Sequence, residues 1–162
     1  MLSVRMLNRI PAFRGLDDES VQDLLPVVNR VEIAAYQPIF QEDEDAKKIY
    51  FLESGKVIIS IRDGAGGRKT VSVVRPGECF GWSALVPPFV FGASAHAQEP
   101  SEVDVIDGDA LRLRMRKHPD LAWSVFEALA ATIAERLAGT RVQLLTATLA
   151  SPLHRKPDPR HI

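Results

Sequence analysis

The stretch KKIYFLESGKVIISIRDGAGGRKTVSVVRPGECF, residues 47–80, decides the fold class, because short alternating runs are separated by turn residues. Its turns contain Gly55 and the glycine-rich residues 64–67. The alternating apolar residues are Ile49 and Phe51, then Val57, Ile59 and Ile61, then Val71 and Val73. A period of two is typical of β-strands, and glycine-containing turns between such runs favour hairpins. We therefore predict antiparallel hairpins across this region.

Further short runs flank this stretch. VNRVEIAAY and PIFQ precede it, and SEVDVID follows it with Val103 and Val105. Many short strands without long helices between them are typical of an antiparallel barrel or jelly roll. Before the first strand, residues 6–28 indicate two short helices, the second capped by Asp17 or Asp18. We predict a mainly β fold with flanking helices, built on a double-stranded β-helix (jelly-roll) barrel.

One long helix is predicted near the end of the chain, over about residues 119–149. Residues spaced by three and four form a seam more than three heptads long. The seam consists of Trp123, Phe126, Ala130, Ile133, Leu137, Thr140, Leu144 and Ala147. A second stripe consists of Leu121, Val125 and Leu129. A helix this apolar needs two partners. We expect the barrel on one side and the same helix of a second subunit on the other, which makes the protein a homodimer. The alternative is a helix wholly buried within a monomer.

Length and composition set the class of the protein. The chain has 162 residues, 46% of them hydrophobic, and a net charge of −1. These values suit one ordinary globular domain, expected over residues 1–150, with residues 151–162 as a disordered tail. The near-zero net charge gives no general attraction to nucleic acid. No secretory signal or membrane span is expected, so we expect a cytoplasmic protein.

The order of elements resembles the cyclic nucleotide-binding domain of the catabolite activator and Crp-Fnr superfamily. IPAFRGLDDESVQDL, residues 10–24, and IYFLESGKVIIS, residues 49–60, are similar to its opening helices and its first glycine turn. VVRPGECFGWSAL, residues 73–85, resembles the start of its phosphate-binding cassette, and ASAHAQEPSEVDVIDGDAL, residues 93–111, resembles the strands that follow. The resemblance covers roughly residues 9–148. It implies a non-catalytic regulatory or sensor domain.

Two charged contacts of that family are missing. The resemblance implies a cassette glutamate that binds the ribose 2′-hydroxyl and an arginine that pairs with the cyclic phosphate. Trp82 stands at the glutamate position, and Phe91 stands at the arginine position, or Val90 or Gly92 if the register shifts by one residue. Indeed, no acidic or basic side chain occurs over residues 79–98 apart from neutral His96. Loss of the arginine pair alone would weaken binding by roughly 2–4 kcal/mol, or about 30- to 1000-fold.

The resemblance implies a pocket, and three alternatives are open for what occupies it. It binds cyclic AMP or cyclic GMP weakly or not at all, and the backbone N–H groups of Gly81, Trp82, Ser83 and Ala84 partly replace the lost cation. It accepts a different small apolar or aromatic ligand. Or the aromatic side chains of Trp82, Phe89 and Phe91 fill it as core and leave a ligand-free dimeric interaction module. The expected pocket residues are Gly81, Trp82, Ser83, Ala84, Phe91, Gly92, Ala93, Ser94 and Thr140.

Other chemistries find little support. Too few residues follow the long helix for a helix-turn-helix, so no direct DNA binding is expected, although a protein partner remains open. The histidines include no H-x-H pair, which argues against a metal-dependent cupin enzyme and predicts no metal site. Cys79 is the single cysteine, so neither a disulfide nor an all-cysteine metal site can form within one chain. It is expected to be packed rather than nucleophilic, and we predict no enzymatic activity.

Overall fold

The structure is a computed structural model that describes residues 7–149. The described strands form two four-stranded antiparallel sheets, in the orders β1-β8-β3-β6 and β2-β7-β4-β5. This arrangement confirms the predicted jelly roll, although the hydrogen bonds form two separate sheets rather than a closed barrel. The strands are β1 (Val28–Ile33), β2 (Pro38–Phe40), β3 (Lys48–Ser54), β4 (Val57–Arg62), β5 (Arg68–Val74), β6 (Cys79–Phe80), β7 (Ser94–Ala97) and β8 (Ser101–Asp107).

The two predicted turns of residues 47–80 differ in what they connect. The glycine-rich turn joins β4 to β5 in a true hairpin, with Arg62 opposite Arg68. The turn at Gly55 instead carries the chain from one sheet to the other, because β3 pairs with β6 and β8. Gly55 has a φ of +92°, and an added Cβ would lie 2.6 Å from the carbonyl oxygen of Pro100. A glycine is therefore required there.

Strand β3 does not show the alternating burial that its sequence predicted. Four consecutive residues, Ile49 to Leu52, are buried. The outer face is covered by the N-terminal segment, where Phe13 of η1 (Pro11–Phe13) packs on Phe51 with 4.9 Å between ring centroids. On the other face, Tyr50 stacks on Phe80 at 5.0 Å. A strand covered on both faces loses its period of two.

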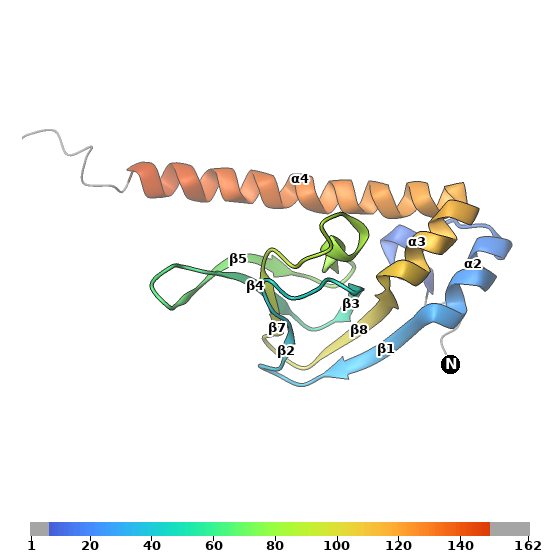
Figure 1. The fold of residues 1–162 in the computed structure, drawn as a ribbon, viewed down its shortest axis with the longest axis horizontal. Helices are drawn as coiled ribbons and strands as arrows, with labels where there is room; N and C mark the ends of the chain where they lie inside the picture. The colour runs from blue at the N-terminus through green and yellow to red at the C-terminus, as the bar shows by residue number, and fades with distance from the viewer. Residues whose placement is uncertain (1–6, 150–162) are drawn as a thin grey trace, which may run out of the picture.

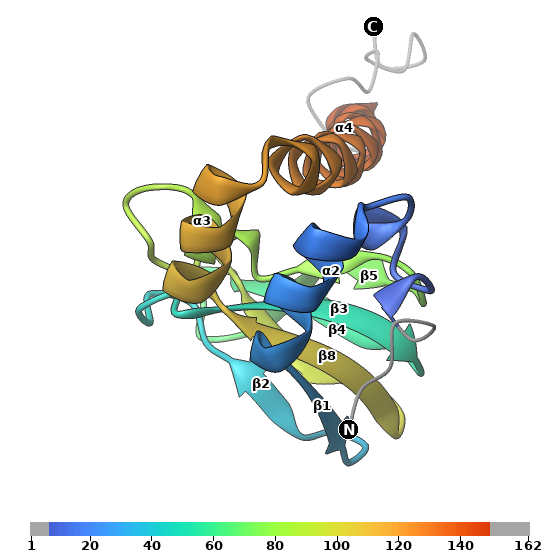
Figure 2. The same cartoon turned by 90° about the vertical axis from the view of Figure 1, so that its right-hand side faces the viewer.

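Three helices gather at one end of the two sheets (Figure 2). They are α2 (Asp18–Leu24), α3 (Gly108–Lys117) and the start of α4 (Pro119–Leu149). Asp17 caps α2 by accepting a hydrogen bond of 2.7 Å from the backbone N–H of Ser20. The predicted cap was Asp17 or Asp18, and the structure selects Asp17. Helix α3 was not predicted from the sequence. Its signals are the cap at Asp107 and the buried residues Leu111 and Met115, four positions apart.

Helix α4 runs along the whole length of the sandwich, and its C-terminal end extends beyond the strands (Figure 1). The second stripe predicted for it, Leu121, Val125 and Leu129, is buried against the body of the domain. Within residues 7–149, no helix is both long enough and apolar enough to cross a membrane. The tail predicted at residues 151–162 lies outside the described residues.

Candidate functional site

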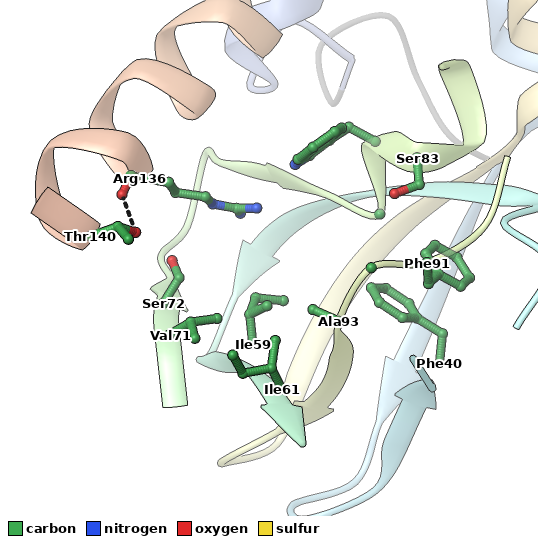
Figure 3. A pocket seen from close by; sticks show the side chains of 13 residues that line it. Phe40, Ile59, Ile61, Val71, Ser72, Ser83, Phe91, Ala93, Arg136 and Thr140 are labelled. Carbon is green, nitrogen blue, oxygen red and sulfur yellow. Dashed lines mark hydrogen bonds between the residues drawn. The ribbon is translucent and has the colours of Figure 1, made fainter. Parts of the chain in front are cut away.

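A cavity of about 270 Å³ lies between α4, the strands β4 and β5, and the uncharged stretch that follows β6. The uncharged stretch contributes a short 3-10 helix, η3 (Trp82–Leu85). Figure 3 shows side chains from all of these elements around one space. The cavity is lined by Phe40, Ile59, Ile61, Val71, Ser72, Gly81, Trp82, Ser83, Phe91, Gly92, Ala93, Arg136 and Thr140. Most of these side chains are apolar, as is usual for small-molecule sites.

Most of the predicted pocket residues line this cavity. They are Gly81, Trp82, Ser83, Phe91, Gly92, Ala93 and Thr140. Two predicted members do not line the cavity. Ala84 is fully buried, and its carbonyl oxygen accepts a hydrogen bond from Arg112. Ser94 is also buried, and its hydroxyl accepts a hydrogen bond of 2.9 Å from the backbone N–H of Glu42. Neither residue therefore belongs to the cavity lining.

Gly81 sets the path of the chain into η3. Its φ is +71°, and an added Cβ would lie 2.8 Å from Cδ2 of Tyr50, so no other residue fits without movement. The carbonyl oxygen of Gly81 accepts the backbone N–H of Ala84 at 3.1 Å. Because that N–H is already bonded, it cannot join the anion-binding group of backbone donors that the sequence suggested.

The three aromatic residues that follow β6, Trp82, Phe89 and Phe91, have different environments. Phe91 is only 4% exposed and stacks on Phe40, with ring centroids 3.8 Å apart and planes 10° apart. Phe89 is exposed and lies beneath the guanidinium of Arg112, 4.4 Å from it. Trp82 is half-buried and lines the cavity. Thus Phe91 is a core residue, yet the three rings together leave the cavity open.

Sequence reasoning missed Arg136, the one charged side chain among the cavity-lining residues described. It is half-buried, and its Nη2 donates a hydrogen bond of 3.1 Å to the carbonyl oxygen of Cys79. Burial lowers the pKa of its guanidinium, while nearby Cys79, Glu78 and Glu135 act in the opposite direction. The signal in the sequence was spacing. Arg136 lies four residues before Thr140, so both occupy the same face of a helix.

Thr140 also lies beside Arg136 in space. Its hydroxyl donates to the carbonyl oxygen of Arg136 at 2.9 Å, within α4. A second, more polar cavity of about 330 Å³ adjoins the first and shares Val71, Ser72 and Arg136 with it. Arg75, Glu78 and Glu135 are among the residues that line this second cavity. Arg136 therefore stands at the border between an apolar and a polar space.

Cys79 has no features of a nucleophile. It is 5% exposed, and burial raises the pKa of its thiol, although contacts with Thr132 and Arg136 oppose the shift. The sulfur lies 3.7 Å from the hydroxyl of Thr132 on α4. The described part of the chain holds no cluster of three histidine, cysteine or acidic side chains that could bind a metal ion.

The seam of α4 faces outward in a single chain. All eight seam residues are exposed, including 70% of Trp123, 50% of Leu137 and 67% of Leu144. The remaining seam residues are Phe126, Ala130, Ile133, Thr140 and Ala147. The alternative of a helix wholly buried within a monomer is therefore wrong. Several large apolar side chains in one row mark an unpartnered face.

Comparison with known proteins agrees with the fold described above. The sequence pattern of the cyclic nucleotide-binding domain matches residues 30–118, and the chain belongs to that family. Over 134 residues it is 30% identical to the cyclic AMP receptor protein of Thermus thermophilus, covering 83% of this chain and 60% of that protein. The chain thus spans about 60% of the length of the curated relative it matches.

Two solved structures have the same fold. A candidate cyclic nucleotide-binding protein from Geobacter metallireducens has a TM-score of 0.73 and 28% identity, covering 85% of this chain and 99% of that one. The catabolite activator protein of Thermus thermophilus has a TM-score of 0.67 and 29% identity, covering 85% of this chain and 63% of that one. The family is one of regulatory ligand-binding domains, so the resemblance stated from the sequence is confirmed.

Proposed function

We propose that this chain is a non-catalytic sensor domain whose cavity beneath α4 binds a small molecule. We further propose that this molecule is not a cyclic nucleotide, which the cavity would bind weakly or not at all. The observation that carries the proposal is the open cavity of about 270 Å³ beside Trp82. If the ligand site had become part of the packed core, Trp82, Phe89 and Phe91 would be expected to fill it. Phe91 instead packs into the core against Phe40, and the space beside Trp82 stays open.

Cyclic AMP and cyclic GMP fit this wall poorly. Trp82 places an indole ring where the resemblance implies a ribose-binding glutamate. Phe91 and Gly92 leave the arginine position without a charge, and a buried phosphate without a paired cation is unfavourable by several kcal/mol. Arg136 is a cation on the opposite wall, from α4. We therefore expect cyclic nucleotides to bind weakly or not at all.

We further propose that two copies of the chain associate through the seam of α4. Exposed apolar residues spaced three and four apart are the pattern of a coiled-coil interface. Thr140 belongs to both the seam and the cavity wall, and Leu137 is the seam residue next to Arg136. Occupation of the cavity would therefore act directly on the helix at the dimer interface. This arrangement gives a sensor domain a route by which a ligand changes association.

A thermal-shift series with cyclic AMP and cyclic GMP tests the nucleotide part of the proposal. The wild-type chain is compared with a variant carrying Trp82→Glu and Gly92→Arg, which restores the two charged contacts. Gly92 is the chosen arginine position because an added Cβ there meets no atom within 4 Å. Phe91→Arg would instead place a charge in the core, since Phe91 is 4% exposed.

A ligand at about 100 times its dissociation constant adds about 2.7 kcal/mol, which is a shift of about 5–10 °C at this size. The proposal predicts a negligible shift in the wild type and a clear shift in the double variant. The single variant Trp82→Glu is the matched control, because it removes the ring without supplying the cation. A full shift in the wild type would show that the lost contacts are replaced, and the degenerate-site proposal would be wrong.

A further inference from the structure

Arg136 differs from the other half-buried arginines of the domain. Arg30, Arg112 and Arg114 each pair with a carboxylate, namely Asp104, Asp109 and Asp23. Within residues 7–149, no carboxylate oxygen lies within 4.0 Å of the Arg136 guanidinium. A half-buried cation without an anionic partner is unfavourable by itself. Such an arrangement is expected where a ligand supplies the anion.

The guanidinium of Arg136 also has further N–H donors with which a ligand could form hydrogen bonds. A guanidinium carries five N–H donors in a planar fork, and within residues 7–149 Arg136 uses one of them, from Nη2 to the carbonyl oxygen of Cys79. Figure 3 shows the side chain extending from α4 into the cavity, with Thr140 and Ser72 beside it. Glu78 and Glu135 line the adjoining polar cavity, and their charges act on Arg136 only at longer range. The fork fits a planar carboxylate with two parallel hydrogen bonds.

The opposite end of the cavity is apolar and partly aromatic. Phe40 and Phe91 lie across the space from Arg136 (Figure 3), and Ile59 and Ile61 form the floor between them. Side-chain hydroxyls on the wall come from Ser72, Ser83 and Thr140, and the described wall carries no carboxylate. It therefore lacks the charged acceptor that the family's glutamate would offer to a ribose hydroxyl. It suits a flat hydrocarbon ring instead.

We propose that the cavity binds a small aromatic carboxylic acid, with its carboxylate on Arg136 and its ring against Phe91 and the isoleucines. The volume of about 270 Å³ lies just below the usual range for ligand sites, about 300–1,000 Å³, which matches a small ligand of one or two rings. This inference rests on the proposed sensor function, because it names the class of ligand for the same cavity. It adds that the anion is held from α4 rather than from the segment after β6.

Isothermal titration calorimetry of the full chain with phenylacetate and indole-3-acetate tests the inference. Phenylacetamide and indole-3-acetamide have the same shape without the charge, and cyclic AMP is the nucleotide arm. Arg136→Gln removes the cation but keeps a polar side chain with N–H donors at this position. Arg75→Gln is the matched control, because Arg75 lines the adjoining polar cavity but not this one.

At least one of the two acids binds, its amide binds at least about 10-fold more weakly, and Arg136→Gln weakens the acid by about 10- to 100-fold. Arg75→Gln leaves the affinity unchanged. Arg136→Lys recovers only part of the affinity, because an ammonium group lacks the fork. Acid and amide binding equally well, with no effect of Arg136→Gln, would overturn the inference while leaving the sensor function intact. Binding of cyclic AMP in place of both acids would also overturn it.

If neither acid, neither amide nor cyclic AMP binds, the inference is overturned. The proposed sensor function has its own test in the cavity-filling variant Ala93→Phe.

Discussion

The Arg136 side chain donates a hydrogen bond of 3.1 Å from Nη2 to the carbonyl oxygen of Cys79, and this bond joins α4 to β6. The same guanidinium lines the cavity beneath the helix. One residue therefore connects the cavity, the strand that leads into the uncharged stretch, and the helix that carries the exposed seam. A ligand on Arg136 would compete with or reinforce a bond between two elements of the fold.

The first prediction is that Arg136 contributes little to the stability of the empty domain. Arg136→Gln loses a charge-assisted bond but also removes the burial of an unpaired cation, so the free energy of unfolding should change by less than about 1 kcal/mol. Arg30→Gln is the comparison, because Arg30 makes two hydrogen bonds of 2.8 and 2.7 Å to Asp104, which is fully buried.

Arg30→Gln should lower the free energy of unfolding by about 3 kcal/mol, since it leaves a buried carboxylate uncompensated. Urea titrations of both variants measure the two changes. Equal losses of unfolding free energy in the two variants would mean that Arg136 mainly stabilises the fold.

The second prediction concerns association through α4. Leu137→Glu should convert the proposed dimer to a monomer, because it places two like charges in the centre of the proposed interface. Val142→Glu is the matched control, since Val142 is exposed to 63% but lies on the side of the helix away from the seam. Sedimentation equilibrium gives the mass of each variant. A wild-type monomer, or equal dissociation by both substitutions, would contradict the proposed interface.

The third prediction is a dependence of stability on pH that comes from Asp120. Burial acts to raise the pKa of this carboxyl group, but bonds from the backbone N–H of Leu121 and from the hydroxyl of Ser20 outweigh it, and the pKa is lowered. A carboxyl group with a lowered pKa stabilises the fold above its unfolded pKa of about 3.9, and this stabilisation is lost as the pH falls through the folded value.

The difference in unfolding free energy between wild type and Asp120→Asn should therefore shrink as the pH is lowered from 6 to below 4. Ser20→Ala should reduce the same pH dependence, because it removes one of the bonds that lower the pKa. Chemical denaturation at several pH values measures this. A difference that grows on acidification would show that the pKa of Asp120 is raised instead.

The fourth prediction separates backbone strain from steric contact at the entrance to η3. Gly81 and Gly64 have nearly the same φ, +71° and +75°, but an added Cβ meets Tyr50 at 2.8 Å in the first case and no atom within 4 Å in the second. Gly64→Ala should be destabilising by about 1–2 kcal/mol from the left-handed backbone alone. Gly81→Ala should lose clearly more. Equal losses in thermal unfolding would mean that Tyr50 moves aside freely.

The sequence predicted the parts of this fold that depend on local pattern. The jelly-roll class, the cap at Asp17 and the buried stripe of Leu121, Val125 and Leu129 all follow from spacing or turn chemistry. The turn at Gly55 was assigned to a hairpin although it crosses between sheets. A turn sequence fixes the local backbone but not the partner that each strand finds.

The candidate site was predictable only where the resemblance marked it. Seven of the nine expected pocket residues line the cavity, because they belong to one continuous stretch or to the expected contact at Thr140. Ser94 was misplaced because the side of a strand that a residue faces depends on a register that one sequence does not give. Arg136 was missed because its role comes from the docking of α4, which is a tertiary contact.

The claim that the cavity takes a small molecule is tested most directly by filling it. Ala93 is half-buried and lines the cavity, so Ala93→Phe would occupy the space with a side chain. Saturation-transfer NMR is recorded for the wild type and for Ala93→Phe with phenylacetate, indole-3-acetate, their two amides, cyclic AMP and a set of uncharged aromatic fragments. We predict a signal from at least one of the two acids in the wild type that disappears in Ala93→Phe, while the folded spectrum is kept. Signals from uncharged fragments alone would overturn the ligand class and leave the small-molecule cavity in place, whereas no signal from any compound, or signals unchanged by Ala93→Phe, would contradict the claim that the cavity takes a small molecule.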